Sequence, residues 1–160
     1  TEVGFRYPTF SRLEQAELLS YLTLEVASRD EYESILWFRF RNRRPETKYT
    51  YQQRSSLGFG MTGWADESTT PSLGAFSFLN ALLAQTTQIQ REQIGSVVRF
   101  TLIRQSELIG VAEFTWRMPR MGKSELPGGA VLCDVVGGTE VADKSSLIFH
   151  VPADVYKALQ

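Results

Sequence analysis

Hydrophobic and polar residues alternate most regularly between Val98 and Trp116. In the first part of this stretch, Val98–Ile103, the period of two places Phe100 on one side of a strand and Arg99 and Thr101 on the other. A short polar loop follows, and a second apolar run begins at Leu108. The stretch therefore predicts a β-hairpin with one buried face.

Similar runs, either alternating or rich in β-branched and aromatic residues, predict further strands. They lie at Leu18–Val26, Ile35–Arg41, Lys48–Gln52, Ala75–Leu79, Ala130–Val136 and Ser145–Val151. Together with the hairpin they give about eight strands separated by polar turns. The expected fold class is all-β, an antiparallel Greek-key β-sandwich.

One or two short helices accompany these strands. Ser11 and Glu14 form a capping-box pattern, which predicts a short helix before the strand at Leu18–Val26; a longer helix with Ala16 and Leu19 on one face is the alternative. Ala81–Gln90 is a marginal helix because of its Thr and Gln content. The tail Pro152–Gln160 has helical spacing and is either a closing helix or the start of a truncated element.

The composition indicates one domain spanning residues 1–160. The chain has 160 residues, 42% of them hydrophobic, with a formal net charge of -1. No run approaches the roughly 18 apolar residues of a membrane span. Cys133 is the single cysteine and the first residues lack an apolar signal core, so we expect a reducing, cytoplasmic location. A chain that opens at Thr1 is expected to be excised from a longer protein.

The order of motifs carries a resemblance over most of the chain. Strands at Leu22–Val26, Ile35–Arg41 and Lys48–Gln52 are followed by Thr70-Pro71 before Ala75–Leu79, and Val98–Leu102 precedes an Ile109-Gly110 entry to the next strand. This order resembles that of the C2 domains, a family of calcium- and lipid-binding β-sandwiches. Jelly rolls and other Greek-key sandwiches produce similar patterns.

The loops depart from the calcium-binding pattern of that family. Calcium requires about six to eight oxygen ligands. The later loop offers Arg104, Gln105, Ser106 and Glu107, and the earlier one only Asp30, Glu31 and Glu33. The resemblance therefore implies a calcium-independent member with no metal or cofactor, which binds a protein partner or, weakly, a lipid surface.

A basic aromatic segment, Arg39–Arg54, is the predicted binding face. It contains six basic residues and a single acidic residue, Glu46. Guanidinium groups pair with phosphate, and tyrosines stack on bases or lie at a lipid headgroup interface. The expected contacts are Arg39, Arg41, Arg43, Arg44, Lys48, Tyr49, Tyr51 and Arg54. The resemblance favours a phosphoinositide; the alternatives are single-stranded RNA or DNA, or a solvated edge strand that only prevents aggregation.

A second, weaker docking surface combines an aromatic residue with a basic, methionine-containing loop, for which a plain connector is the alternative. Its residues are Trp37, Arg117, Met118, Arg120 and Met121.

Catalytic signals are few. His150 is the single histidine and alternates with Phe149 and Val151, and Cys133 lies in an apolar run where a buried, inert thiol is expected. Gly58, Gly60 and Gly63 match a nucleotide-binding spacing, but no helix start follows them. The prediction is a non-catalytic, peripheral protein-assembly module with anionic-lipid contact. The alternatives are a nucleic-acid-binding β-domain and a viral or phage structural subunit.

Overall fold

The computed structural model describes residues 2–3, 10–29, 36–37, 70–116, 129–142 and 144–160. The helices are α1 (Arg12–Ala27), α3 (Pro71–Leu83) and α4 (Ala153–Leu159). The strands are β1 (Glu2–Val3), β2 (Leu36–Trp37), β3 (Gln88–Ile94), β4 (Val97–Arg104), β5 (Glu107–Phe114), β6 (Ala130–Cys133) and β7 (Leu147–Pro152).

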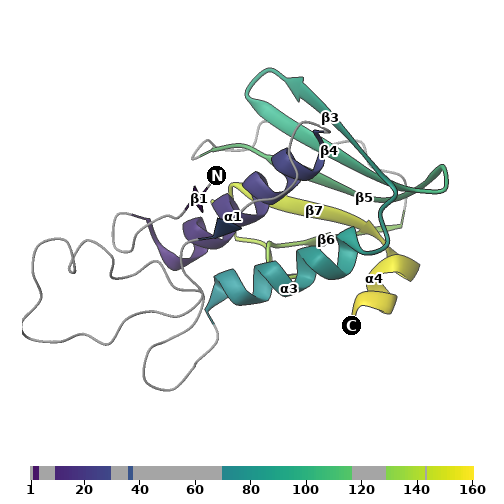
Figure 1. The fold of residues 1–160 in the computed structure, drawn as a ribbon. Coiled ribbons are helices and arrows are strands. Elements are labelled where there is room, and N and C mark those ends of the chain that lie inside the picture. Colours follow the sequence, from purple (N-terminus) through teal and green to yellow (C-terminus); the bar gives the residue numbers. More distant parts are fainter. Residues whose placement is uncertain (1, 4–9, 30–35, 38–69, 117–128, 143) are drawn as a thin grey trace, which may run out of the picture.

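Five of these strands form one antiparallel sheet with the order β3-β4-β5-β7-β6. Helices α1 and α3 lie side by side across one face of it, and α4 follows directly from the end of β7 (Figure 1). We call the covered face the inner face and the opposite one the outer face. The short strands β1 and β2 pair in parallel as a separate ladder.

The core fills the space between the inner face and the two helices. Phe100, Phe114 and Phe149 project from three neighbouring strands and are buried. Tyr21 of α1 stacks on Phe114 with ring centroids 4.1 Å apart, and Phe78 of α3 meets Phe149 edge-on at 5.3 Å. Aromatic pairs in these arrangements add about 0.5–1.5 kcal/mol each to the benefit of burial. These contacts fix both helices on the same face.

The strand predicted at Leu18–Val26 is wrong, because this segment belongs to α1. The Ser11 side chain accepts the Glu14 N–H at 3.1 Å, and the Ser11 N–H donates to the Glu14 carboxylate at 2.8 Å. Once this cap is formed, each further residue adds one backbone hydrogen bond, and the following sequence is rich in Leu, Glu and Ala, which favour helices. The longer-helix alternative is the correct one.

The strand predicted at Ala75–Leu79 is also wrong. These residues lie inside α3, which begins at Pro71 in the first turn, where its missing N–H costs nothing. The buried residues Ala75, Phe78, Leu79 and Leu82 recur at three- and four-residue spacing. The helix ends at Leu83, so the helix predicted at Ala81–Gln90 is correct only for Ala81–Leu83, and β3, which begins at Gln88, was missed.

The antiparallel sheet itself is confirmed. The hairpin at Val98–Trp116 forms β4 and β5, the run at Ser145–Val151 forms most of β7, and the tail forms α4. The run at Ala130–Val136 is strand only as far as Cys133. Because the described residues place helices, not a second large sheet, on the inner face, they show neither the sandwich nor its eight strands.

Candidate functional site

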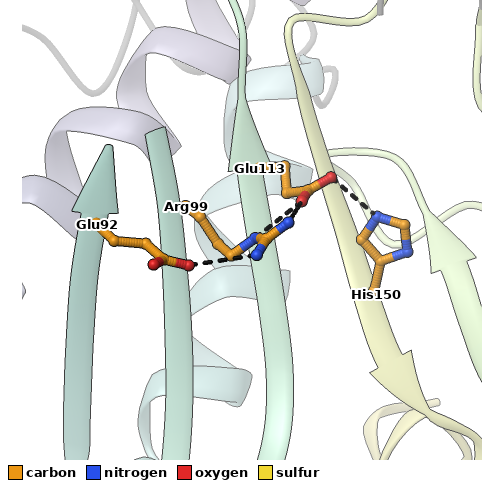
Figure 2. Close-up of polar contacts among 4 residues, drawn as sticks. All are labelled: Glu92, Arg99, Glu113 and His150. Carbon is orange, nitrogen blue, oxygen red and sulfur yellow. Dashed lines mark hydrogen bonds and ion pairs between the residues drawn. The ribbon is translucent and has the colours of Figure 1, made fainter. Parts of the chain in front are cut away.

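A row of three charged side chains and one histidine, which we call the charged row, crosses the outer face of the sheet. Its members come from four successive strands, β3, β4, β5 and β7, in the order Glu92, Arg99, Glu113 and His150 (Figure 2). The register places Glu92 opposite Arg99 and Arg99 opposite Glu113. His150 lies diagonally across from Glu113, because its direct partner on β5 is Val111. Strand pairing therefore assembles residues that are up to 58 positions apart in the sequence.

Arg99 joins the two carboxylates of this row. Its Nε and Nη2 donate to Oε1 of Glu113 at 3.0 and 2.8 Å, and its Nη1 donates to Oε1 of Glu92 at 3.3 Å. The hydrogen bond with Glu113 is the main reason that the pKa of Arg99 lies above its usual value. Arg99 is therefore a permanent cation that holds Glu113 in one position.

The row runs from solvent into the protein. The exposed fractions of the side chains fall steadily from strand to strand: Glu92 53%, Arg99 29%, Glu113 14% and His150 8%. A charge interaction strengthens as water is excluded from it. The Glu113–His150 end is therefore where electrostatics have most effect.

His150 is the side chain at the buried end of the row. Its Nε2 lies 3.6 Å from Oε2 of Glu113, slightly beyond hydrogen-bonding distance, and this buried nitrogen has no hydrogen-bond partner. Glu113 thus offers one oxygen to Arg99 and turns the other toward the imidazole (Figure 2). A histidine close to a fixed carboxylate is an arrangement suited to proton transfer.

A second polar cluster lies on the inner side and is structural. Glu17 of α1 is 1% exposed, and its Oε1 accepts the Ser146 backbone N–H at 2.7 Å. Burial raises the pKa of Glu17, and hydrogen bonds from Ser146 and Leu147 offset this only in part. Because its carboxylate is hydrogen-bonded to the backbone at the start of β7, we assign Glu17 to the attachment of α1 to β7.

Cys133 has no role in the site. It pairs in register with Phe149, whereas Leu132 pairs with His150, so Cys133 and His150 point to opposite faces of the sheet. Burial raises the pKa of the Cys133 thiol to about 11. The expectation of a buried thiol is confirmed, and its inertness stays a prediction.

The sequence-predicted binding faces lie almost entirely outside the described residues. This holds for the basic segment Arg39–Arg54, for Arg117, Met118, Arg120 and Met121, and for the glycines Gly58, Gly60 and Gly63. Trp37 belongs to β2, but the position of its side chain is not described. Binding of a protein partner, a phosphoinositide or a nucleic acid through these residues stays a prediction, as does the C2 resemblance.

Two further observations concern metal binding and membrane insertion. In the described part of the chain, no three His, Cys, Asp or Glu side chains come together as a metal site would require. None of the helices there combines the length and the hydrophobicity needed to cross a membrane.

Comparison with known proteins gives a fold match without a family. No family model and no curated protein sequence matches the chain. The structure is similar to that of a family 39 glycoside hydrolase from the gut symbiont Bacteroides cellulosilyticus WH2, with a TM-score of 0.70 and 19% sequence identity. The match covers 95% of this chain but only 31% of the hydrolase chain. At this identity the likeness concerns the fold alone.

The match corrects the prediction that the chain is not an enzyme. That prediction rested on the absence of recognisable catalytic motifs in the sequence, whereas the matched fold occurs in a catalytic protein. Fold by itself does not determine activity, so a function has to be argued from the side chains.

Sequence reasoning missed the charged row although part of its signal was present. The period of two already placed Arg99 opposite to Phe100, and the hairpin register places Glu113 beside Arg99. The pairing of β7 with β5 joins segments separated by a long connection, so the sequence did not reveal that His150 lies next to Glu113.

Proposed function

We propose that this chain carries a proton-transfer site of a hydrolase, with His150 as the general base and Glu113 as the residue that positions it. The observation that carries the proposal is the buried Nε2 of His150, which has no hydrogen-bond partner and lies 3.6 Å from Oε2 of Glu113, a carboxylate that Arg99 holds through its other oxygen. The occurrence of the fold in a glycoside hydrolase adds support at the level of the fold.

The chemistry follows from the two nitrogens of the imidazole. With Nε2 protonated toward Glu113, Nδ1 has a free lone pair and accepts a proton from an attacking water. The negative charge of Glu113 stabilises the imidazolium that results. Nδ1 then returns the proton to the leaving oxygen of the substrate, which restores the neutral imidazole.

A mechanism based on a pair of carboxylates fits the site less well. Glycosidases that use such a pair need one of the two groups protonated as the general acid. Here Glu92 and Glu113 both accept hydrogen bonds from the guanidinium of Arg99, so the arginine lies between the two carboxyl groups, where the glycosidic bond would have to lie. The histidine is therefore the better proton carrier.

The test is hydrolysis of nitrophenyl esters and nitrophenyl glycosides by the 160-residue chain. We expect His150→Asn to lower kcat by about 10²- to 10⁴-fold, the usual contribution of a general base. Glu113→Gln should lower kcat less and change the pH profile of kcat/KM, because it alters the imidazole's environment without removing it. The proposal fails if no substrate of either class is hydrolysed or if His150→Asn retains full activity.

The matched control is Glu107→Gln. Glu107 also forms an ion pair with an arginine on the same hairpin, at 3.1 Å from Arg104, but its side chain is 61% exposed. This variant should keep the full rate. An equal loss in Glu107→Gln and Glu113→Gln would point to general destabilisation of the hairpin and would contradict the assigned role of Glu113.

A further inference from the structure

The outer face beside the charged row carries a second group of polar side chains, which we call the amide strip: Gln88 and Gln90 of β3 and Thr101 of β4. We propose that the amide strip binds a neutral, hydroxyl-rich ligand, a saccharide, and so supplies the substrate class for the proposed proton-transfer site. This inference rests on the proposed function only for what happens to the ligand after it is bound.

The register makes the strip continuous with the charged row. Gln90 lies opposite Thr101, and two residues further along the same strands Glu92 lies opposite Arg99. Positions two apart on a strand share a face, at about 6.6 Å spacing. A ligand lying along Gln88 and Gln90 therefore extends toward Glu92, the exposed end of the row, and reaches Arg99 on the neighbouring strand.

The side chains of the strip are available for a ligand. Gln88 and Gln90 are exposed and Thr101 is half-buried, and none of these three side chains makes a hydrogen bond within the described part of the chain. A side-chain amide both donates and accepts hydrogen bonds, as a sugar hydroxyl does. The strip thus matches the hydrogen-bonding pattern of a polyol.

The absence of lysine from this surface supports a binding role. Exposed edge strands commonly carry lysine to prevent association. β3 is an edge of the sheet, yet the whole segment Gln88–Phe114 contains no lysine, and the outward positions before Glu92 are glutamines. A surface that needed only solubility would not require uncharged amides at these positions.

The local charge selects a neutral ligand over an anion. Arg99 is the cation nearest to the strip on the outer face, since Arg91 points to the inner face, and Arg99 is already bound by both Glu92 and Glu113. An anionic ligand would have to displace one carboxylate and would meet the remaining negative charge. A neutral ligand encounters neither cost.

The experiment is isothermal titration calorimetry of the full chain with cellohexaose, xylohexaose and mannohexaose, and with a heparin hexasaccharide as the anionic probe. We expect at least one neutral probe to bind, with Gln88→Ala/Gln90→Ala weakening it roughly 5- to 100-fold, as two lost hydrogen bonds predict. Gln93→Ala is the matched control, because Gln93 lies on β3 but on the opposite face. Its affinity should equal that of the unmodified chain.

The outcomes separate this inference from the proposed function. Binding that survives in His150→Asn without hydrolysis by the unmodified chain supports the saccharide site and contradicts the proton-transfer role. Hydrolysis of nitrophenyl esters without binding of any neutral probe supports the proton-transfer site and contradicts the saccharide site. The inference is also overturned if only the heparin probe binds, or if Gln93→Ala weakens binding as much as the double variant.

Discussion

Single residues of this chain acquire their chemistry from the face of the sheet on which they lie. Cys133 and His150 occupy neighbouring strands, but the thiol points into the core and the imidazole points to the outer face. The thiol is fully buried, whereas the imidazole faces a fixed carboxylate. A difference of one residue in strand register therefore decides whether a side chain on these strands lies in the core or on the outer face.

The burial of Cys133 leads to a prediction about its reactivity. With its pKa raised to about 11, only about one thiol in a thousand is ionised at pH 8 in the native protein. We expect a disulfide exchange reagent to label the native protein at least 100-fold more slowly than the same protein in denaturant. Native labelling at the rate of the denatured chain would show that the strand β6 does not bury this residue.

At the scale of elements, the turn after β6 shows how a loop is fixed against a helix. Asp134 accepts the N–H groups of Val136 and Gly138 at 3.0 and 2.7 Å, and Gly137 has a φ of 84°, in the left-handed region. A Cβ on Gly137 would lie 2.7 Å from a ring carbon of Phe78 on α3. This turn therefore requires glycine for both conformation and space.

We predict that Gly137→Ala lowers the free energy of unfolding by about 2–4 kcal/mol, from backbone strain together with overpacking against Phe78. Gly95→Ala is the control, because Gly95 has a φ of 60° and no atom within 4 Å of the added Cβ. It should cost only about 1–2 kcal/mol, from the backbone alone. Denaturant unfolding of both variants measures the difference, and equal losses would contradict the packing argument.

At the scale of the whole molecule, Glu17 joins the N-terminal helix to the last strand across 129 residues. Its pKa is raised in the folded state by burial. A carboxyl group with a raised folded-state pKa binds its proton more tightly when folded, so its contribution to stability is complete below its ordinary pKa. That contribution is lost as the pH rises through the folded value.

The corresponding prediction compares the chain with Glu17→Gln. The amide retains an acceptor for the Ser146 N–H but does not titrate. The stability of the variant relative to the unmodified chain should therefore increase as the pH rises above about 4.5. The increase should be about 1.4 kcal/mol for each unit by which folding raises the pKa of Glu17. The variant is compared with the unmodified chain because Glu25 affects the pH dependence of stability in the opposite direction. Burial alone would raise the pKa of Glu25, but hydrogen bonds from Arg91 and Arg29 lower it. Denaturant unfolding between pH 4 and pH 8 measures both curves; parallel curves would refute the assignment.

The sequence by itself determined the features that depend on neighbouring residues. The Ser11–Glu14 cap, the hairpin of β4 and β5 and the alternation that places Arg99 and His150 on the outer face all follow from spacings of two to four residues or from a short turn. These patterns are local, so they can be read without knowing which strands pair.

Tertiary structure alone decided how far the N-terminal helix extends, that α3 replaces a strand, and which strands are neighbours. Apolar runs such as Ala75–Leu79 fit either a buried strand or a helix, and burial against the sheet selects the helix. The candidate site depends on the pairing of β5 with β7, which brings Glu113 to His150. Such a contact depends on the packing of the whole sheet, and no short segment encodes it.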